Sequence, residues 1–144
     1  MNDCPICVKH QHQENIIYEG ANWIIFNGPY ESQLLGYFHL APKRHVENWS
    51  ELTTEELSQM GHVIHYVEKK LKEFISIDRL YTVTISEQVR HLHIHLIPRT
   101  VSNSVKGLKL IEQATQQTIN SSNYTITRLE YNEFYKKMND HFIE

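Results

Sequence analysis

The sequence predicts an α+β fold, in which one long helix is laid over an antiparallel sheet of about five strands. Segments with alternating apolar residues lie before residue 42 and again between residues 81 and 97, and an amphipathic stretch separates them. Three strands, a helix and two more strands are typical of this architecture. A chain of 144 residues with 40% hydrophobic residues is long enough to form one domain with its own core.

Turn residues delimit the strands. Residues 15–28 alternate around the turn Glu19-Gly20-Ala21-Asn22, which indicates a hairpin. The turn signal Asn27-Gly28-Pro29-Tyr30 follows, and residues 37–41 are predicted to form a third strand that ends at Pro42. Residues 81–85 and 92–97 predict two adjacent strands joined by a tight connection, and we expect Pro98 to end the second.

A capping box marks the start of the long helix, because Thr53 can cap it while the Glu56 side chain reaches back to the Thr53 amide. The apolar residues that follow recur at spacings of three and four. This stripe is expected to pack on the sheet or on a partner subunit, and it consists of Leu57, Met60, Ile64, Val67, Leu71 and Phe74.

The pattern weakens beyond Thr100. Helices are expected at about residues 108–118 and 131–142, with loop-like polar segments around them. We therefore divide the chain into residues 1–105, which carry the sheet and the long helix, and a C-terminal helical extension of residues 106–144. The extension is expected to pack on the same single domain.

Composition excludes several functional classes. The formal charge of −3 offers no basic surface for a nucleic-acid polymer. The apolar runs are only a handful of residues long, so no membrane span is predicted. The first residues lack the basic and apolar regions of a signal peptide, and a cytoplasmic location is the expectation.

Three histidines on alternate positions are the strongest functional signal. In the run His91-Leu92-His93-Ile94-His95-Leu96-Ile97, the side chains of an extended strand alternate between its two faces. All three imidazoles therefore share one face, and the leucine and isoleucine side chains point into a core. Imidazole is the side chain that titrates near neutral pH, so the row predicts a reaction or metal site.

Two chemistries fit this row of histidines. Neighbours on one strand face lie about 6.6 Å apart, so two of them can converge on one metal ion but a third cannot easily join them. Alternatively, a neutral imidazole nitrogen attacks phosphorus and forms a phosphohistidine-type intermediate. The other ring nitrogen must then be held by an acceptor that selects the tautomer.

The only two cysteines have the spacing of a metal-binding pair. Cys4-Pro5-Ile6-Cys7 can grip a tetrahedral zinc ion with two thiolates, although redox pairs share this spacing. A thioredoxin-like role would need a βαβ setting, which this short segment does not offer. The remaining alternative is a reduced, metal-free pair. His10 and His12 are expected to be solvated turn residues rather than additional ligands.

The histidine run resembles the signature of the histidine-triad (HIT) family, which alternates three histidines with apolar residues. The upstream segment from Gly36 to His45, with its Pro-Lys-x-His ending, is similar to the apolar strand that precedes the triad in the family. The resemblance spans roughly residues 4–100. It implies a HIT-like fold, with residues 1–105 as the HIT domain, and a homodimer.

The resemblance also implies an activity and a set of residues. HIT enzymes hydrolyse or transfer nucleoside monophosphate groups from dinucleoside polyphosphates, nucleoside phosphoramidates and related conjugates. By analogy His93 would be the nucleophile, and His95 would contact the phosphate or the departing group. Asn27 would contact the ribose. Zinc-containing relatives imply a closed Zn²⁺ site, with Cys4, Cys7, His45 and His91 as ligands, and four protein ligands make such an ion structural.

The chain departs from the family pattern at two places. Many members carry a glycine-rich loop before the triad, whereas Ser86-Glu87-Gln88-Val89-Arg90 has no glycine. Gln88 occupies the position of the usual hydroxyl residue and is expected to donate to phosphate, while Glu87 places a negative charge near an anionic substrate. At the position after Gly36, where the family often has a histidine, this chain has Tyr37.

Three functional hypotheses remain at this point. The first is a nucleotide hydrolase or transferase with covalent catalysis at His93. The second is a nucleotide-binding module whose triad is catalytically idle, and the altered loop makes this alternative worth testing. The third is a metal hydrolase in which His91 and His93 hold a catalytic ion.

Overall fold

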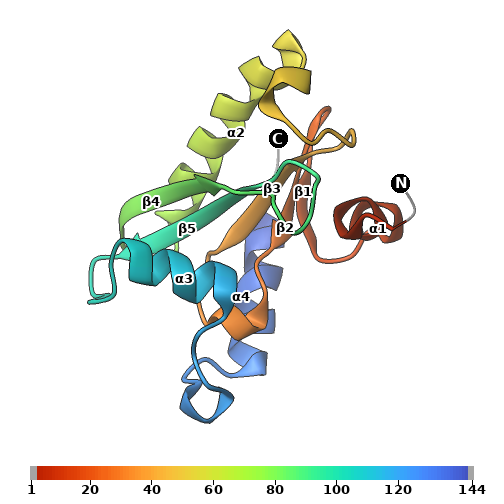
Figure 1. The fold of residues 1–144 in the computed structure, drawn as a ribbon. Coiled ribbons are helices and arrows are strands. Elements are labelled where there is room, and N and C mark those ends of the chain that lie inside the picture. Colours follow the sequence, from red (N-terminus) through yellow and green to blue (C-terminus); the bar gives the residue numbers. More distant parts are fainter. Residues whose placement is uncertain (1–2, 143–144) are drawn as a thin grey trace.

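A computed structural model describes residues 3–142 of the chain as five strands, four α-helices and three short 3-10 turns. Figure 1 shows their arrangement. The elements in chain order are α1 (Pro5–His12), β1 (Ile16–Glu19), β2 (Trp23–Asn27), β3 (Phe38–Pro42), α2 (Thr54–Leu71), β4 (Ile77–Thr84), β5 (Ile94–Thr100), α3 (Leu108–Gln116) and α4 (Arg128–His141).

The five strands form one sheet in the order β1-β2-β3-β5-β4, and each neighbouring pair is antiparallel. The α+β architecture and the five-stranded sheet predicted from the sequence are thus confirmed. In the centre of the sheet, His39 of β3 lies opposite His95 of β5. Because directly opposed residues project to the same face, this register brings a fourth histidine to the face that carries the histidine run.

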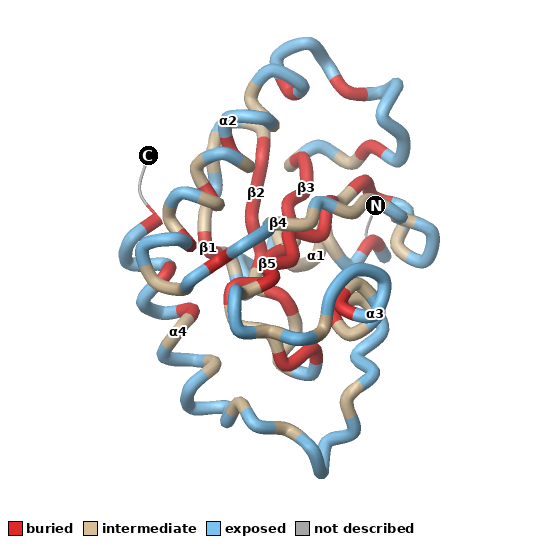
Figure 2. Tube along the Cα trace, turned by 90° about the vertical axis from the view of Figure 1, so that its left-hand side faces the viewer, coloured by how far each residue is buried: buried red, intermediate tan, exposed pale blue. Residues whose placement is uncertain are grey.

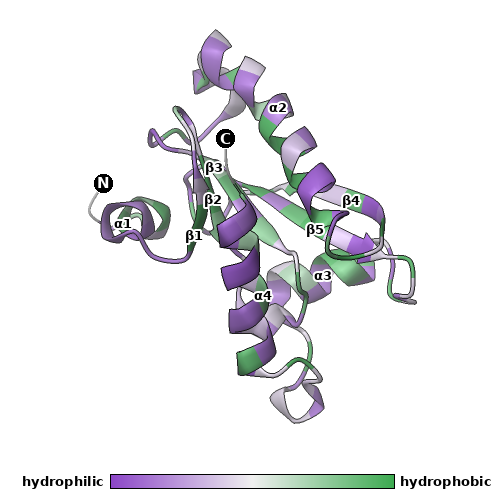
Figure 3. Ribbon diagram, turned by 180° about the vertical axis from the view of Figure 1, so that it is seen from behind, coloured by the Kyte–Doolittle hydropathy of each residue, from purple (hydrophilic) through white to green (hydrophobic). Residues whose placement is uncertain are grey.

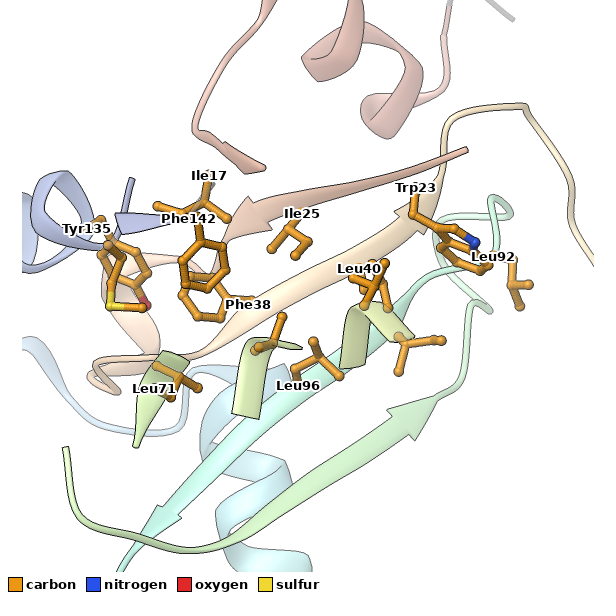
Figure 4. Close-up of a cluster of buried hydrophobic side chains, with 14 of the residues drawn as sticks. Ile17, Trp23, Ile25, Phe38, Leu40, Leu71, Leu92, Leu96, Tyr135 and Phe142 are labelled. Carbon is orange, nitrogen blue, oxygen red and sulfur yellow. The ribbon is translucent and has the colours of Figure 1, made fainter. Parts of the chain in front are cut away.

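One face of the sheet is covered by α2 and α4, and it holds the main hydrophobic core (Figure 4). Strand residues of one parity supply the sheet side of this core, among them Ile25, Phe38, Leu40, Leu92 and Leu96. Helix α4 crosses this face in Figure 3 and contributes Tyr135 and Met138, which are 3% and 0% exposed. The C-terminal extension is therefore built into the main core.

The opposite face is covered at two separate places. Helix α3 packs Leu110 and Ala114 against Tyr37 and Ile97, and it lies in front of the sheet in Figure 1. Helix α1 covers a small cluster of Ile24, Phe26 and Ala41 through Ile6. Figure 2 shows buried residues concentrated along the strands and exposed residues along the outer helix surfaces. The histidines lie between these two covered patches.

The long helix begins as predicted, and all of the predicted stripe except Leu57 packs in or against the main core. Thr53 accepts from the Glu56 amide, and the Glu56 carboxylate accepts from the Thr53 amide, which completes the capping box. The buried stripe is Glu56, Val63, Val67 and Leu71, at i, i+7, i+11 and i+15. Leu57 lies off this stripe and is 44% exposed, and Phe74 follows the end of the helix at Leu71.

Other elements also differ from the sequence prediction. Strand β4 begins at Ile77, before the predicted start at residue 81. Strand β5 continues through Pro98 to Thr100, because its pairing with β3 stops at Leu96 and a proline beyond that point costs no bond to β3. Helix α1 was not predicted, and it places His10 and His12 on a helix rather than in a turn. It lacks a buried residue, so no apolar periodicity marks it in the sequence. None of the helices in residues 3–142 is long and apolar enough to span a membrane.

Candidate functional site

The histidine run sits where β5 begins. His91 and His93 precede the first strand residue, Ile94, but the alternation predicted from the sequence holds through the whole run. Leu92, Ile94 and Leu96 are at most 3% exposed and belong to the main core. These buried side chains fix the backbone that carries the three imidazoles. Each imidazole contacts a different set of residues.

His91 belongs to a cluster of four metal-ligating side chains. The ligand atoms of Cys4, Cys7, His45 and His91 all lie within 4.8 Å of one another. Cys4 caps α1 by accepting from the Cys7 amide at 3.4 Å, and Pro5 occupies the first helical position. This arrangement turns both sulfurs of the Cys-Pro-Ile-Cys motif towards the histidines. The residues that begin the helix are therefore also the candidate metal ligands.

The distances in this cluster fit a tetrahedral zinc ion. Zinc bonds of about 2.3 Å to sulfur and 2.0–2.1 Å to nitrogen put sulfur and nitrogen roughly 3.6 Å apart at tetrahedral angles. His91 Nδ1 lies 3.5 Å from Cys4 Sγ and 3.6 Å from Cys7 Sγ, and His45 Nδ1 lies 3.5 Å from Cys7 Sγ. His91 Nε2 donates to the Pro42 carbonyl at 2.8 Å, which leaves Nδ1 with the lone pair that a metal needs.

His93 is held in the opposite tautomer. Its Nδ1 donates to the His91 carbonyl at 2.8 Å, so its Nε2 carries the lone pair. The Ser86 hydroxyl accepts from the His93 amide at 3.1 Å and holds the backbone at this position. Burial, and to a smaller extent the positive charge of Lys9, lowers the pKa of His93. The ring is therefore neutral near pH 7, as a nucleophile must be.

His95 faces the same region but is tied to other groups. Its Nδ1 lies 2.7 Å from the Tyr37 hydroxyl, and the same hydroxyl lies 2.8 Å from His39 Nε2. The ring centroids of His93 and His95 are 5.0 Å apart. Burial lowers the pKa of His95 to about 4, so this ring is also neutral near pH 7.

A cavity of about 300 Å³ opens in front of His93 and His95. This volume is at the lower end of ordinary small-molecule sites. Gln88 lines the cavity, as does Glu87, whose carboxylate pairs with Arg90 at 3.2 Å. The remaining lining residues come from the loop before the triad and from α3: Ile85, Ser86, Val89, Thr115 and Gln116.

Asn27, the expected ribose contact, is not among the residues that line this cavity. It has the same strand parity as Trp23 and Ile25, and its side chain therefore projects towards α4. There it lines a different cavity with Tyr131 and Tyr135, on the face of the sheet opposite to His93. Its buried Oδ1 has no hydrogen-bond partner within residues 3–142.

Lys9 brings a positive charge to the histidine face. It lies on α1, and its ammonium sits 5.7 Å from the centre of the Phe26 ring. Phe26 pairs directly with His39 across β2 and β3, which places Lys9 next to the four-histidine region. Burial lowers the pKa of Lys9. His10, by contrast, pairs with Glu19 at 3.1 Å and stands outside the metal cluster.

Several residues of the site were not assigned a role from the sequence. Tyr37 and His39 are two positions apart on a strand, and their alternation with apolar Phe38 and Leu40 was the available signal that they face away from the core. Lys9 gave no signal, because the helix that carries it was not predicted. Thr115 and Gln116 come from the extension, where only the tertiary packing of α3 shows that they approach the cavity.

Comparison with known proteins gives one family. Residues 9–102 match the model of the HIT domain. Solved structures with similar folds include a hypothetical histidine triad nucleotide-binding protein from Sulfolobus tokodaii (TM-score 0.67, 20% identity, covering 95% of this chain and 90% of that one). A Zn-bound histidine triad family protein from Mycobacterium smegmatis has a TM-score of 0.68 at 16% identity and covers 97% and 95% of the two chains.

A third similar structure is a Hit-like protein involved in cell-cycle regulation from Bartonella henselae, with a TM-score of 0.66, 22% identity and coverage of 97% and 96%. At such identities the likeness shows the fold alone. A comparison with curated proteins finds no significant match.

Proposed function

The chain belongs to the HIT family, and on this premise we propose that it cleaves the α-phosphate bond of a nucleoside 5′-phosphate conjugate through a nucleotidyl intermediate on His93. Family membership supports nucleotide binding and a hydrolase or transferase class of reaction. The substrates we propose are a dinucleoside polyphosphate or a nucleoside phosphoramidate.

One observation carries this proposal: the His91 carbonyl accepts from His93 Nδ1 at 2.8 Å. The lone pair is then on Nε2, and His93 lines the cavity. In the first step Nε2 attacks the α-phosphorus, a nitrogen–phosphorus bond forms, and the bond to the leaving group breaks. The ring becomes positively charged, and the His91 carbonyl stabilises this charge through the Nδ1 hydrogen bond. In the second step water attacks the phosphorus and releases the nucleotide from His93.

The substrate contacts follow from the cavity lining. Gln88 and His95 are the proposed hydrogen-bond donors to the phosphate or the leaving group, because both line the cavity beside His93. Lys9 adds a positive charge on the side of α1. The Glu87 carboxylate is only partly offset by Arg90, which also pairs with Glu47, so the loop before the triad keeps some negative charge beside the substrate.

The decisive assay is turnover of a fluorogenic adenosine phosphoramidate and of a dinucleoside polyphosphate by the wild type and by His93→Ala. We expect His93→Ala to lose at least roughly 1,000-fold in kcat, because the covalent route is removed. His65→Ala, at an exposed position of α2, is the matched histidine control and should keep wild-type activity. Equal rates for His93→Ala and the wild type would contradict the mechanism.

A quench in alkaline detergent during turnover of a radiolabelled nucleotide offers a second test. The wild type should retain label that is released by mild acid and stable in alkali, which is the behaviour of a nitrogen–phosphorus bond. Calorimetric binding of nucleotide without turnover of any substrate in a panel would instead favour the idle-triad alternative.

The residues Cys4, Cys7, His45 and His91 would hold a structural Zn²⁺ ion. The donor set is two sulfurs and two imidazole nitrogens, the sulfur–nitrogen distances suit a tetrahedron, and His91 is in the required tautomer. Zinc would supply a cross-link between α1 and the start of β5. His93 is outside this group, which argues against a catalytic metal on His91 and His93.

Metal analysis of purified protein tests the zinc site. The wild type is expected to hold about one zinc per chain. Cys7→Ser should lose it, and His10→Asn should retain it because His10 lies outside the cluster. A zinc content that is unchanged in Cys7→Ser would exclude this ligand set.

We also propose a homodimer and a cytoplasmic location. The first follows from the family, and a sedimentation mass of one chain at micromolar concentration would count against it. The second follows from the metal site, because both cysteines must stay reduced to bind zinc and the cytoplasm keeps thiols reduced. Fractionation of cells that express the chain would check the location.

A further inference from the structure

A pair of residues outside the triad, Tyr37 and His39, contacts its third member. His39 faces His95 directly across β3 and β5, with ring centroids 5.0 Å apart. The Tyr37 hydroxyl lies 2.7 Å from His95 Nδ1 and 2.8 Å from His39 Nε2. Tyr37 is 1% exposed, so water does not compete for this hydroxyl. The three side chains form a continuous chain of hydrogen bonds that ends at the cavity.

A phenol hydroxyl has a single hydrogen, and this limits the chain to two arrangements. If Tyr37 donates to one imidazole nitrogen, the other nitrogen must carry a hydrogen and donate to the phenol oxygen. The tautomers of His39 and His95 are therefore coupled. Either both rings carry the hydrogen on Nε2, or both carry it on Nδ1.

The groups in this chain are in the protonation states that the argument needs. Burial lowers the pKa of His39 well below its ordinary value and that of His95 to about 4, and both rings are neutral. Burial raises the pKa of Tyr37, so the phenol keeps its hydrogen. Neutral imidazole in water prefers the tautomer with hydrogen on Nε2, and only the first of the two arrangements gives both rings this tautomer.

We propose that His39 and Tyr37 are positioning residues that hold His95 with its hydrogen on Nε2, so that His95 offers a hydrogen-bond donor to the cavity. His95 Nε2 has no hydrogen-bond partner among residues 3–142, which leaves this donor for a ligand. His93, held by the His91 carbonyl, offers a bare Nε2 in the same cavity. Two neighbouring imidazoles thus receive opposite roles, one as nucleophile and one as donor to the phosphate or leaving group.

This inference rests on the proposed function for its kinetic consequence, but the tautomers can be measured without turnover. Nitrogen NMR of ¹⁵N-histidine-labelled wild type should show His95 with hydrogen on Nε2. Tyr37→Phe, which removes only the hydroxyl, should give His95 a mixture of tautomers. Tyr30→Phe is the matched control, because the Tyr30 hydroxyl donates to the distant Ile126 carbonyl. It should leave the His95 signals unchanged.

Kinetics then test the role in the reaction. Tyr37→Phe should lower kcat by about tenfold or more and change KM by less than about twofold, as is typical when a partner that orients an active-site group is removed. His39→Leu should behave like Tyr37→Phe. His39→Gln should retain most of the wild-type kcat, because the Gln amide can still donate to the Tyr37 oxygen.

Three results would each overturn the proposal: His95 with hydrogen on Nδ1 in the wild type, unchanged His95 tautomers in Tyr37→Phe, or equal kcat values for His39→Leu and His39→Gln. If Tyr37→Phe fails to fold, the two His39 variants still decide. Failure of the proposed function gives a different result, because a wild type without turnover would still show the His95 tautomer.

Discussion

Replacing His95 by asparagine should make the protein less sensitive to acid. Burial lowers the pKa of His95 from 6.5 to about 4 in the folded protein. Between these values the unfolded chain binds the proton and the folded chain does not, so acid favours unfolding. The contribution of His95 is fully present above pH 6.5 and is lost as the pH falls towards 4. Between pH 7.5 and pH 5.0, proton linkage at His95 lowers the free energy of unfolding by about 2 kcal/mol.

Urea unfolding at both pH values measures this loss. On acidification, the free energy of unfolding of the wild type should fall by about 2 kcal/mol more than that of His95→Asn, because asparagine does not titrate. His65→Asn replaces an exposed histidine on α2 and should lose as much as the wild type. The comparison of variants cancels acid effects at sites that do not contact His95, including the cysteine–histidine cluster. Losses equal to within about 0.5 kcal/mol in the wild type and His95→Asn would refute the reasoning.

Other predictions follow from the cavity and the core. Lys9→Gln should raise KM about tenfold with little change in kcat, since a charge-assisted contact to phosphate is lost; an unchanged KM would remove Lys9 from the site. Glu87→Gln should lower KM because a negative charge beside the cavity is removed, and steady-state kinetics at low salt measure this. Met138→Ala should cost about 2–5 kcal/mol in urea unfolding, because Met138 is fully buried in the core. A cost below roughly 1 kcal/mol would show that α4 is not part of the cooperative core.

Local patterns predicted much of the fold. The hairpin around Gly20 and the Thr53–Glu56 capping box depend on neighbouring residues, and the structure contains both. The stripe predicted on α2 packs on the core apart from exposed Leu57, but the prediction omitted two buried residues, Val63 and Glu56. Buried Glu56 takes part in the inward stripe through its bonds to Arg44 and Thr53, and no hydrophobicity pattern would select a glutamate for that position.

The residues on the functional face could be predicted where alternation along a strand determines which face of the sheet a side chain occupies. The histidine run and the four candidate zinc ligands are brought together as the sequence and the family resemblance suggested. Strand alternation also places Asn27 on the same face as Trp23 and Ile25, which is the face opposite to the histidine run. The Tyr37–His95 contact depends on the register between β3 and β5, which the sequence of either strand alone does not determine.

Because of helix α1, loss of a bound metal would change the surface of the protein as well as its stability. The helix stands apart from the other helices in Figure 1, and its eight residues include none that is buried. An isolated helix of this length is unstable in water. Without a metal cross-link, α1 should detach and uncover the apolar side chains of Ile24 and Phe26. Metal-depleted protein would then expose an apolar patch beside an edge strand. Its tendency to aggregate would therefore depend on the zinc supply.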